Sequence, residues 1–303
     1  MWMVQFQRGH FESLSRPQST SSHLAWTRME NHNPRRNQTS QKGDSRLGTN
    51  RRNPLVSVVI PAYNEEKYVS STIKSLLNQD YENLEIIFVD DHSEDRTFEV
   101  VKKRFGGKIK IYRTDRKYNP STVMNSKPSY ARRYGILKSK GDFILHFSAH
   151  LIAPPNLIST LVRELPDDAV CIGCRDVLYP GTSVIGKIIY LFWSLGRNRL
   201  FPKQDGYVRN IVYGIYRKKV LEELNGFPFG GDCELNIILN RKRYKKYYTT
   251  KTYVYYWWHP KSNNSLTSFV KRMIIYGNAR GFFTKKYNLP SQKYFLLSLL
   301  TLP

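Results

Sequence analysis

The stretch LVSVVIPAYNEEKYVSSTIKSLLNQ, residues 55–79, contains two different hydrophobic periodicities that together indicate the fold. Its first half is a β-branched run that ends at Pro61, which is typical of a buried strand. Its second half has apolar residues at helical spacing: Val69, Ile73, Leu76 and Leu77. The stretch therefore predicts one β-α unit with a polar loop at the carboxyl end of the strand.

The same alternation continues along the chain. Strands are predicted at LEIIFVDD (84–91), KIKIYR (108–113), DFILHFSAH (142–150) and AVCIGCRDVLY (169–179), with amphipathic helices between them. This order predicts the α/β class, as a doubly wound and mostly parallel sheet flanked by helices. Ligands of such sheets bind beyond the carboxyl ends of the strands. We therefore expect Asp90, Asp91 and His150 at one edge of the sheet.

Composition limits the classes of function. The 303 residues are 40% hydrophobic, which is typical of a globular chain, and the formal net charge of +24 requires a surface that attracts polyanions. Phosphorylated small molecules, an anionic membrane surface and nucleic acid all satisfy that requirement. Three cysteines in a chain of this length argue against a disulfide-built secreted fold and favour a reducing compartment.

Three segments are expected. Residues 1–53 are rich in Ser, Asn, Gln and Arg and have little periodic hydrophobicity, so we expect a disordered basic arm. Residues 54–285 hold the α/β domain. Residues 286–303 are apolar and too short to cross a bilayer, so they are expected to pack, to lie in a membrane interface, or to begin a membrane segment. The first residues have no apolar core of signal-peptide length, so a cytoplasmic protein is expected, with peripheral attachment to the cytosolic face of a membrane as an option.

Five motifs occur in an order that resembles glycosyltransferase family 2: VSVVIPAYNEEKYV, IIFVDDHSEDRT, SYARRYGI, GDFILHFSAH and GFPFGGDCEL. The resemblance covers about residues 55–280. It implies a GT-A fold and an enzyme that transfers a sugar, with inversion, from a nucleotide-diphosphate donor to a hydroxyl acceptor. A polysaccharide, a glycan or a lipid-linked sugar would be the acceptor.

The resemblance also implies a nucleotide-sugar site. It places Pro61, Ala62, Tyr63 and Glu65 around the base and ribose, with Tyr63 offering a flat face for stacking. Asp91 resembles the aspartate that binds the nucleobase edge, Asp90 its supporting neighbour, and Arg132 an arginine near the pyrophosphate. Two structural alternatives remain open: Tyr63 as an aromatic residue at the edge of the core, and Asp91 as the cap of the following helix.

The sequence departs from the family at Ser148-Ala149-His150, where most members carry Asp-x-Asp and bind a divalent metal ion. Ser148 cannot supply negative charge, so it is expected to bind the nucleotide-sugar donor and not the metal ion. His150 can bind a metal through a neutral imidazole, and Mn²⁺ suits that ligand better than Mg²⁺. A divalent metal cofactor, weaker in its binding than is usual in the family, is therefore expected.

Asp232 in FGGDCEL matches the family's catalytic carboxylate, although Gly231 replaces the glutamate that usually precedes it. Inverting transfer needs a base that takes the proton from the acceptor hydroxyl, and Asp232 is the candidate. The alternative is an N-cap role at the following helix. By resemblance, the candidates for acceptor binding are Glu234, His259, Lys271 and Arg272. Alternatively, Glu234 simply begins a helix. The alternative for Lys271 and Arg272 is a place on a solvated or membrane-facing helix surface.

Two rival functions remain. The replacements at Ser148 and Gly231 allow a degenerate member that binds nucleotide or glycan without turnover. The net charge allows a polyanion-binding protein, but no RNA-recognition, zinc-finger or helix-turn-helix pattern is present, so specific nucleic-acid binding is not expected.

Overall fold

The computed structural model describes residues 53–114, 127–180, 204–208, 211–224, 231–256 and 285–288, together with single positions at 182, 184, 186, 187, 190, 226, 228 and 283. The predicted basic arm, apart from its last residue, lies outside the described residues, and so does most of the apolar segment 286–303.

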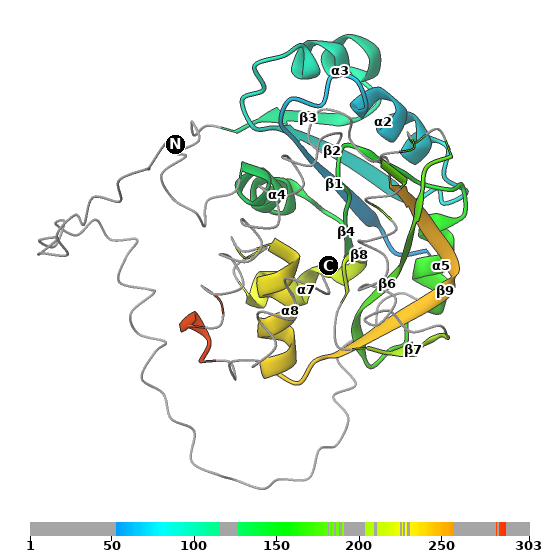
Figure 1. Cartoon of the computed structure of the whole chain (residues 1–303), viewed down its shortest axis with the longest axis vertical. Helices are drawn as coiled ribbons and strands as arrows, with labels where there is room; N and C mark the ends of the chain where they lie inside the picture. The colour runs from blue at the N-terminus through cyan, green and yellow to red at the C-terminus, as the bar shows by residue number, and fades with distance from the viewer. Residues whose placement is uncertain are drawn as a thin grey trace, which may run out of the picture. The chain divides into compact units, whose positions relative to one another are not determined.

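The core of the molecule is one nine-stranded sheet with the order β3-β2-β1-β4-β8-β6-β9-β5, and β7 pairs with β9 (Figure 1). The strands are β1 (Val56–Ala62), β2 (Leu84–Asp90), β3 (Lys110–Arg113), β4 (Phe143–His146), β5 (Leu151–Ile152), β6 (Ala169–Leu178), β7 (Gly206–Tyr207), β8 (Tyr213–Arg217) and β9 (Lys245–Tyr256). The predicted α/β class is confirmed.

Strand direction explains where the site forms. β1 pairs in parallel with both β2 and β4, and β2 pairs in parallel with β3. β8 is antiparallel to both of its neighbours, β4 and β6, so β6 and its parallel partner β9 run in the same direction as β4. The long strands other than β8 therefore place their carboxyl ends at one edge, which confirms the predicted mostly parallel sheet.

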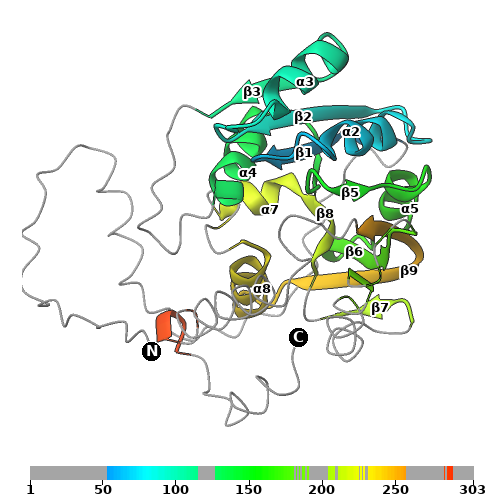
Figure 2. The ribbon, with the colours of Figure 1, turned by 45° about the horizontal axis from the view of Figure 1, so that its top comes forward.

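Helices cover both faces of the sheet. Successive side chains of β1 point to opposite faces, so each face packs against its own set of helices. Val56, Val58 and Ile60 pack in one cluster with α2 (Val69–Leu77), α3 (Thr97–Phe105) and α5 (Leu157–Glu164). Val59 faces the opposite cluster, which includes residues of α4 (Lys127–Lys138), α7 (Lys218–Glu223) and α8 (Gly231–Arg241). Figure 2 shows these two sets of helices on opposite sides of the sheet. The central strands of the sheet are thus covered by helices on both faces.

One boundary differs from the sequence prediction. The fourth strand was expected to continue to His150, but β4 ends at His146, and residues 147–150 turn before the two-residue strand β5. Pairing of β4 with β8 stops at Leu145. The apolar character of Phe147 and Ala149, which suggested a longer strand, comes from burial in the core beside α2 and α5.

Cys171 and Cys174 are structural residues of β6. Both are buried free thiols, and burial raises the pKa of Cys171 to about 12. Neither thiol is therefore placed for metal binding or redox chemistry.

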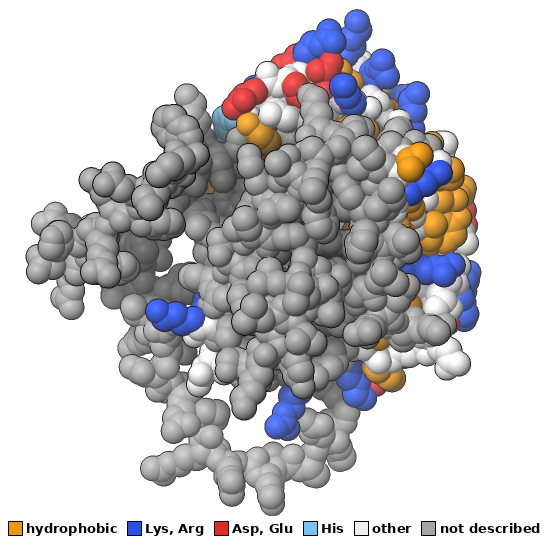
Figure 3. Space-filling view, in the orientation of Figure 1, with side chains coloured by type: hydrophobic (Ala, Val, Ile, Leu, Met, Phe, Trp, Pro, Cys, Tyr) orange, Lys and Arg blue, Asp and Glu red, His pale blue; other side chains and the backbone are white. Residues whose placement is uncertain are grey.

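Part of the positive charge lies on α3, whose last turn carries the exposed side chains of Lys102, Lys103 and Arg104. Basic side chains gather over the edge of the molecule where α2 and α3 lie (Figure 3). Among the described residues, no helix has both the length and the apolar composition that crossing a bilayer requires.

Candidate functional site

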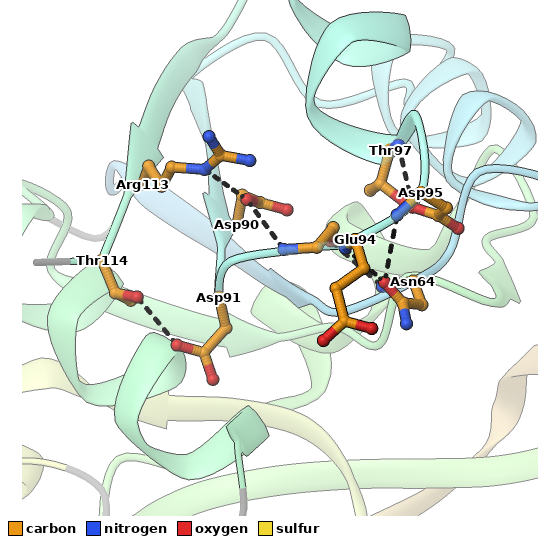
Figure 4. Close-up of polar contacts among 9 residues, drawn as sticks. Asn64, Asp90, Asp91, Glu94, Asp95, Thr97, Arg113 and Thr114 are labelled. Atoms are coloured by element: carbon orange, nitrogen blue, oxygen red, sulfur yellow. Dashed lines mark hydrogen bonds and ion pairs between the residues drawn. The ribbon is translucent and has the colours of Figure 1, made fainter. Parts of the chain in front are cut away.

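Two loops at the carboxyl ends of β1 and β2 are held together by hydrogen bonds. Asn64 adopts a left-handed backbone with φ of 57°, and its Oδ1 accepts hydrogen bonds from the backbone N–H groups of Glu94 and Asp95. The backbone N–H of Glu65 donates to Oγ1 of Thr97 at 2.8 Å. These contacts, part of which appear in Figure 4, fix the PAYNEE loop against the start of α3. The fixed loop places Tyr63 and Glu65 at the edge where ligands of such sheets bind.

Asp90 and Asp91 point to opposite sides, as adjacent residues of an extended chain do (Figure 4). Asp90 is fully buried, pairs with Nε of Arg113 at 2.8 Å and accepts a hydrogen bond from the backbone N–H of Ser93. Asp91 accepts a hydrogen bond from Oγ1 of Thr114 at 2.8 Å. Asp90 is therefore held by Arg113 and Ser93, and its predicted role beside the nucleobase stays a prediction. At the start of α3 it is Asp95, not Asp91, that contacts the helix, because Oδ1 of Asp95 accepts from the backbone N–H of Thr97.

The first-loop residues occupy two kinds of surroundings. Pro61 and Ala62 are buried in β1, and the carbonyl of Ala62 accepts from the backbone N–H of Asp91. Tyr63 is partly exposed, and its hydroxyl donates to Oε1 of Glu94 at 3.0 Å. Since that hydroxyl is anchored on the loop after β2, Tyr63 bridges the two loops on which nucleotide binding is predicted.

His150 lies beside Glu65 and not at the end of a strand. Its Nδ1 lies 3.1 Å from Oε1 of Glu65, and its ring meets Tyr256 edge to face with 5.5 Å between centroids. A carboxylate that accepts from one nitrogen of an imidazole fixes the ring and directs the other nitrogen away from the carboxylate, as is common in histidines that bind metals. The pair therefore fits a divalent ion bound through Nε2 of His150. The described residues contain no group of three or more His, Cys, Asp and Glu side chains placed to hold an ion alone.

Asp232 lies in the first turn of α8, within reach of side chains from three other elements. Nδ1 of His146, at the end of β4, lies 4.0 Å from Oδ1 of Asp232. Burial raises the pKa of Asp232, and the nearby charge of Arg132 on α4 opposes that rise. A raised pKa makes a carboxylate a stronger base, which suits a group that must accept a proton.

Arg132 belongs to this group as well as to the predicted donor site. It is buried on α4, and its Nη1 would lie 3.6 Å from a Cβ atom added at Gly231. That separation is an ordinary van der Waals contact, so Arg132 packs beside the first turn of α8, and glycine suits position 231 because its φ of 66° lies in the left-handed region. Burial lowers the pKa of Arg132, and the charge of Asp232 opposes that effect.

Glu234 is buried on α8 and faces a segment far along the chain. Nζ of Lys286 and the hydroxyl of Tyr287 both donate to its Oε1, at 2.8 and 2.6 Å. These contacts fasten residues near 286 to α8. His259, Lys271 and Arg272 lie outside the described residues, so their predicted roles, like an acceptor role for Glu234, stay predictions.

Sequence reasoning missed three residues at this edge. His146 and Tyr216 lie in strands whose sequences are typical of buried segments, and only the tertiary fold brings them near Asp232 on α8. His92 had a signal that could have been used, because it follows two aspartates at a strand end where the chain must turn. It adopts a left-handed backbone with φ of 56°.

Comparison with known proteins decides the family. The model of the family described as glycosyl transferase family 2 matches residues 57–224, which is more than half of the chain. The chain belongs to glycosyl transferase family 2. Membership of this family confirms the resemblance read from the five motifs, together with the glycosyltransferase activity and the GT-A fold that it implied.

Relatives with sequence similarity to this family 2 chain carry transferase names. The chain is 30% identical over 252 residues to the dolichyl N-acetyl-alpha-D-glucosaminyl phosphate 3-beta-D-2,3-diacetamido-2,3-dideoxy-beta-D-glucuronosyltransferase of Methanococcus voltae, and the match covers 77% of this chain and 74% of that protein. It is 37% identical over 93 residues to an uncharacterized glycosyltransferase of Haemophilus influenzae, and the match covers 30% of this chain and 34% of that protein. The chain thus spans about three quarters of the first relative and about a third of the second.

Two solved structures resemble this family 2 domain at a lower level. TarS 1-349 of S. aureus in complex with UDP has a TM-score of 0.48 at 18% identity, over 74% of this chain and 65% of that one. The mannosyltransferase PcManGT of Pyrobaculum calidifontis, in complex with GDP-Man and Mn²⁺, has a TM-score of 0.49 at 17% identity, over 67% of this chain and 56% of that one. Neither likeness is close enough to assign a ligand to this chain.

Proposed function

We propose that this family 2 domain transfers a sugar, with inversion, from a nucleoside-diphosphate donor to a hydroxyl of a lipid-linked glycan. The observation that carries the proposal is the position of Asp232. It is a partly exposed carboxylate, with 29% of its side-chain surface accessible and a pKa raised by burial, on the same side of the sheet as Arg132.

The part of the proposed site that binds the nucleotide-sugar donor consists of the two loops after β1 and β2, which are hydrogen-bonded to each other. Tyr63 supplies a ring that a base can stack on and Asp91 an acceptor for the base edge, while the backbone N–H of Glu65 holds the first loop against Thr97. Ser148, in the turn after β4, is close in the chain to His150 and is proposed to contact the donor through its hydroxyl. Preformed loops lower the cost of ordering that binding would otherwise require.

A divalent metal ion is part of the proposal. The Glu65–His150 pair supports one imidazole ligand, and the donor diphosphate would supply negatively charged oxygens. Such an ion, when bound, stabilises charge on the departing nucleoside diphosphate. In this proposal, Glu65 orients the ring of His150, and the ring presents Nε2 toward the diphosphate of the bound donor.

The lipid-linked acceptor is supported by the relative from Methanococcus voltae, whose name specifies dolichyl N-acetyl-alpha-D-glucosaminyl phosphate as the molecule acted on. The net charge of +24 and the exposed basic turn of α3 also suit an anionic membrane surface, at which such acceptors lie. We therefore propose peripheral attachment to the cytosolic face of a membrane.

The test compares wild type with Asp232→Asn in single-turnover transfer and in donor hydrolysis, using UDP- and GDP-sugars with lipid-phosphate-linked acceptors and Mn²⁺. Asparagine keeps the shape of the side chain and cannot accept a proton, so donor affinity should be retained while transfer falls by about 10²- to 10⁴-fold. Transfer by Asp232→Asn at the wild-type rate would exclude Asp232 as the base. Nucleotide binding by a wild type that neither transfers nor hydrolyses any donor would favour a binding protein without turnover.

A further inference from the structure

Buried side chains from three elements surround the inner side of Asp232. They are His146 at the end of β4, Arg132 on α4 and Tyr216 on β8, and each is buried. Figure 1 shows β4, β8, α4 and α8 gathered in one part of the molecule. Nδ1 of His146 lies 4.0 Å from Oδ1 of Asp232.

The two oxygens of Asp232 have different surroundings. Oδ1 is inaccessible to solvent and has no hydrogen-bond partner among the described residues, although His146 lies on that side. The side chain as a whole nevertheless keeps 29% of its surface exposed, so the accessible part lies away from Oδ1. One oxygen therefore faces the protein interior, and the other remains for an incoming hydroxyl.

His146 is an unexpected residue for its position. β4 has the sequence FILH, and all four side chains are buried, so a polar ring at this place has to find a partner or lose stability. Burial, together with the charges of Arg132 and His150, holds the pKa of His146 well below its usual range. The imidazole is therefore neutral at ordinary pH and carries one N–H.

We propose that His146 is a positioning residue for Asp232: its Nδ1–H holds Oδ1 of the carboxylate, so that Oδ2 faces the acceptor hydroxyl. The inference rests on the proposed transferase function and adds to it a residue with no assigned role. A separation of 4.0 Å is too long for a hydrogen bond, and contacts of this kind often shorten only in the complex with substrate.

A neutral donor suits this task better than a second cation. Arg132 already places positive charge near Asp232, which favours the ionised carboxylate and weakens it as a base. A further full charge would weaken the base more. A neutral N–H fixes the orientation of the carboxylate with less effect on its affinity for a proton.

The test uses two substitutions of His146. His146→Asn retains an N–H near the position of Nδ1, whereas His146→Leu fills similar volume without a donor. Loss of a hydrogen bond to a charged group should lower kcat of the leucine variant by about 10- to 100-fold, with donor KM and nucleotide affinity unchanged. The asparagine variant should recover most of that loss. Wild-type kcat in the leucine variant, equal losses in both variants, or a loss confined to KM would overturn the proposal.

A second measurement does not depend on turnover. Nitrogen-15 NMR of the histidine-labelled chain should show His146 protonated at Nδ1, with a shift of that N–H in Asp232→Ala and none in Glu234→Ala. Protonation at Nε2 alone would overturn the proposal. A wild type without transfer would contradict the proposed function, and the NMR result would still decide whether His146 is directed at Asp232. Thermal unfolding of each variant shows that it is folded.

Discussion

Glu65 and His150 join the loop after β1 to the turn after β4, with 3.1 Å between Oε1 and Nδ1. The two residues are 85 positions apart, so the contact depends on the parallel pairing of β1 with β4. The contact places the carboxylate of Glu65 beside the imidazole of His150. In most members of the family, an aspartate occupies the position of His150.

Removal of that carboxylate should weaken metal binding. In Glu65→Gln the ring of His150 loses its charged partner, and we expect affinity for Mn²⁺ in the presence of UDP or GDP to fall by about 10- to 100-fold. The loss of the free Mn²⁺ signal in electron paramagnetic resonance measures this directly. Glu66→Gln is the matched control, because Glu66 pairs with Arg96 on the surface. Equal affinities of the Glu65 variant and wild type would show that the pair has no part in holding an ion.

The neighbouring aspartates should separate into a binding and a structural residue. Asp91→Ala is expected to raise the Kd for a nucleoside diphosphate by about 10-fold or more, since a charged acceptor is lost. Asp90→Ala should instead lower the free energy of unfolding by about 1–3 kcal/mol, because it removes the partner of Arg113 and of the Ser93 N–H. Calorimetric titration and denaturant unfolding measure the two effects. The reverse pattern would exchange the two roles.

Strain at His92 gives a prediction about stability. A side chain in a left-handed conformation costs about 1–2 kcal/mol, and Nε2 of His92 is buried with no hydrogen-bond partner among the described residues. His92→Gly should therefore raise the midpoint of thermal unfolding. His92→Ala, which keeps the strained backbone, should not. A lower midpoint for the glycine variant would mean that contacts of the ring outweigh the strain.

Burial of neutral His146 should make the domain sensitive to acid. Its pKa in the folded state lies well below the ordinary 6.5, so the unfolded chain binds the extra proton as pH falls through 6.5. Stability from this residue is thus complete above pH 6.5 and declines below it, by up to about 1.4 kcal/mol per pH unit. Denaturant unfolding between pH 7.5 and 5 should show a smaller decline in His146→Leu. Identical slopes would place the acid sensitivity elsewhere.

Electrostatic attachment to membranes should depend on salt. We expect the full chain to sediment with vesicles that contain phosphatidylserine at low ionic strength, and to be released as salt screens the attraction. Charge reversal at Lys102 and Lys103 should weaken binding more than the same change at Lys242 and Arg243, which are exposed in the turn that follows α8. Absence of binding at low salt would contradict peripheral attachment by charge.

The sequence by itself determined the α/β class and the family, because strands and helices have different hydrophobic periods and the motifs lie in a fixed order. It also directed attention to Asp90, Asp91 and Asp232, since strand ends and helix starts can be read locally. The tertiary structure decided the partners of these residues. The sequence led to His150 as the histidine at the tip of β4, yet the strand ends at His146, the last residue of β4 that pairs with β1. The approach of His146 to Asp232 and the contact of His150 with Glu65 join residues that lie 86 and 85 positions apart in the sequence. No local pattern contains such contacts, because they follow from the order and direction of strands in the sheet.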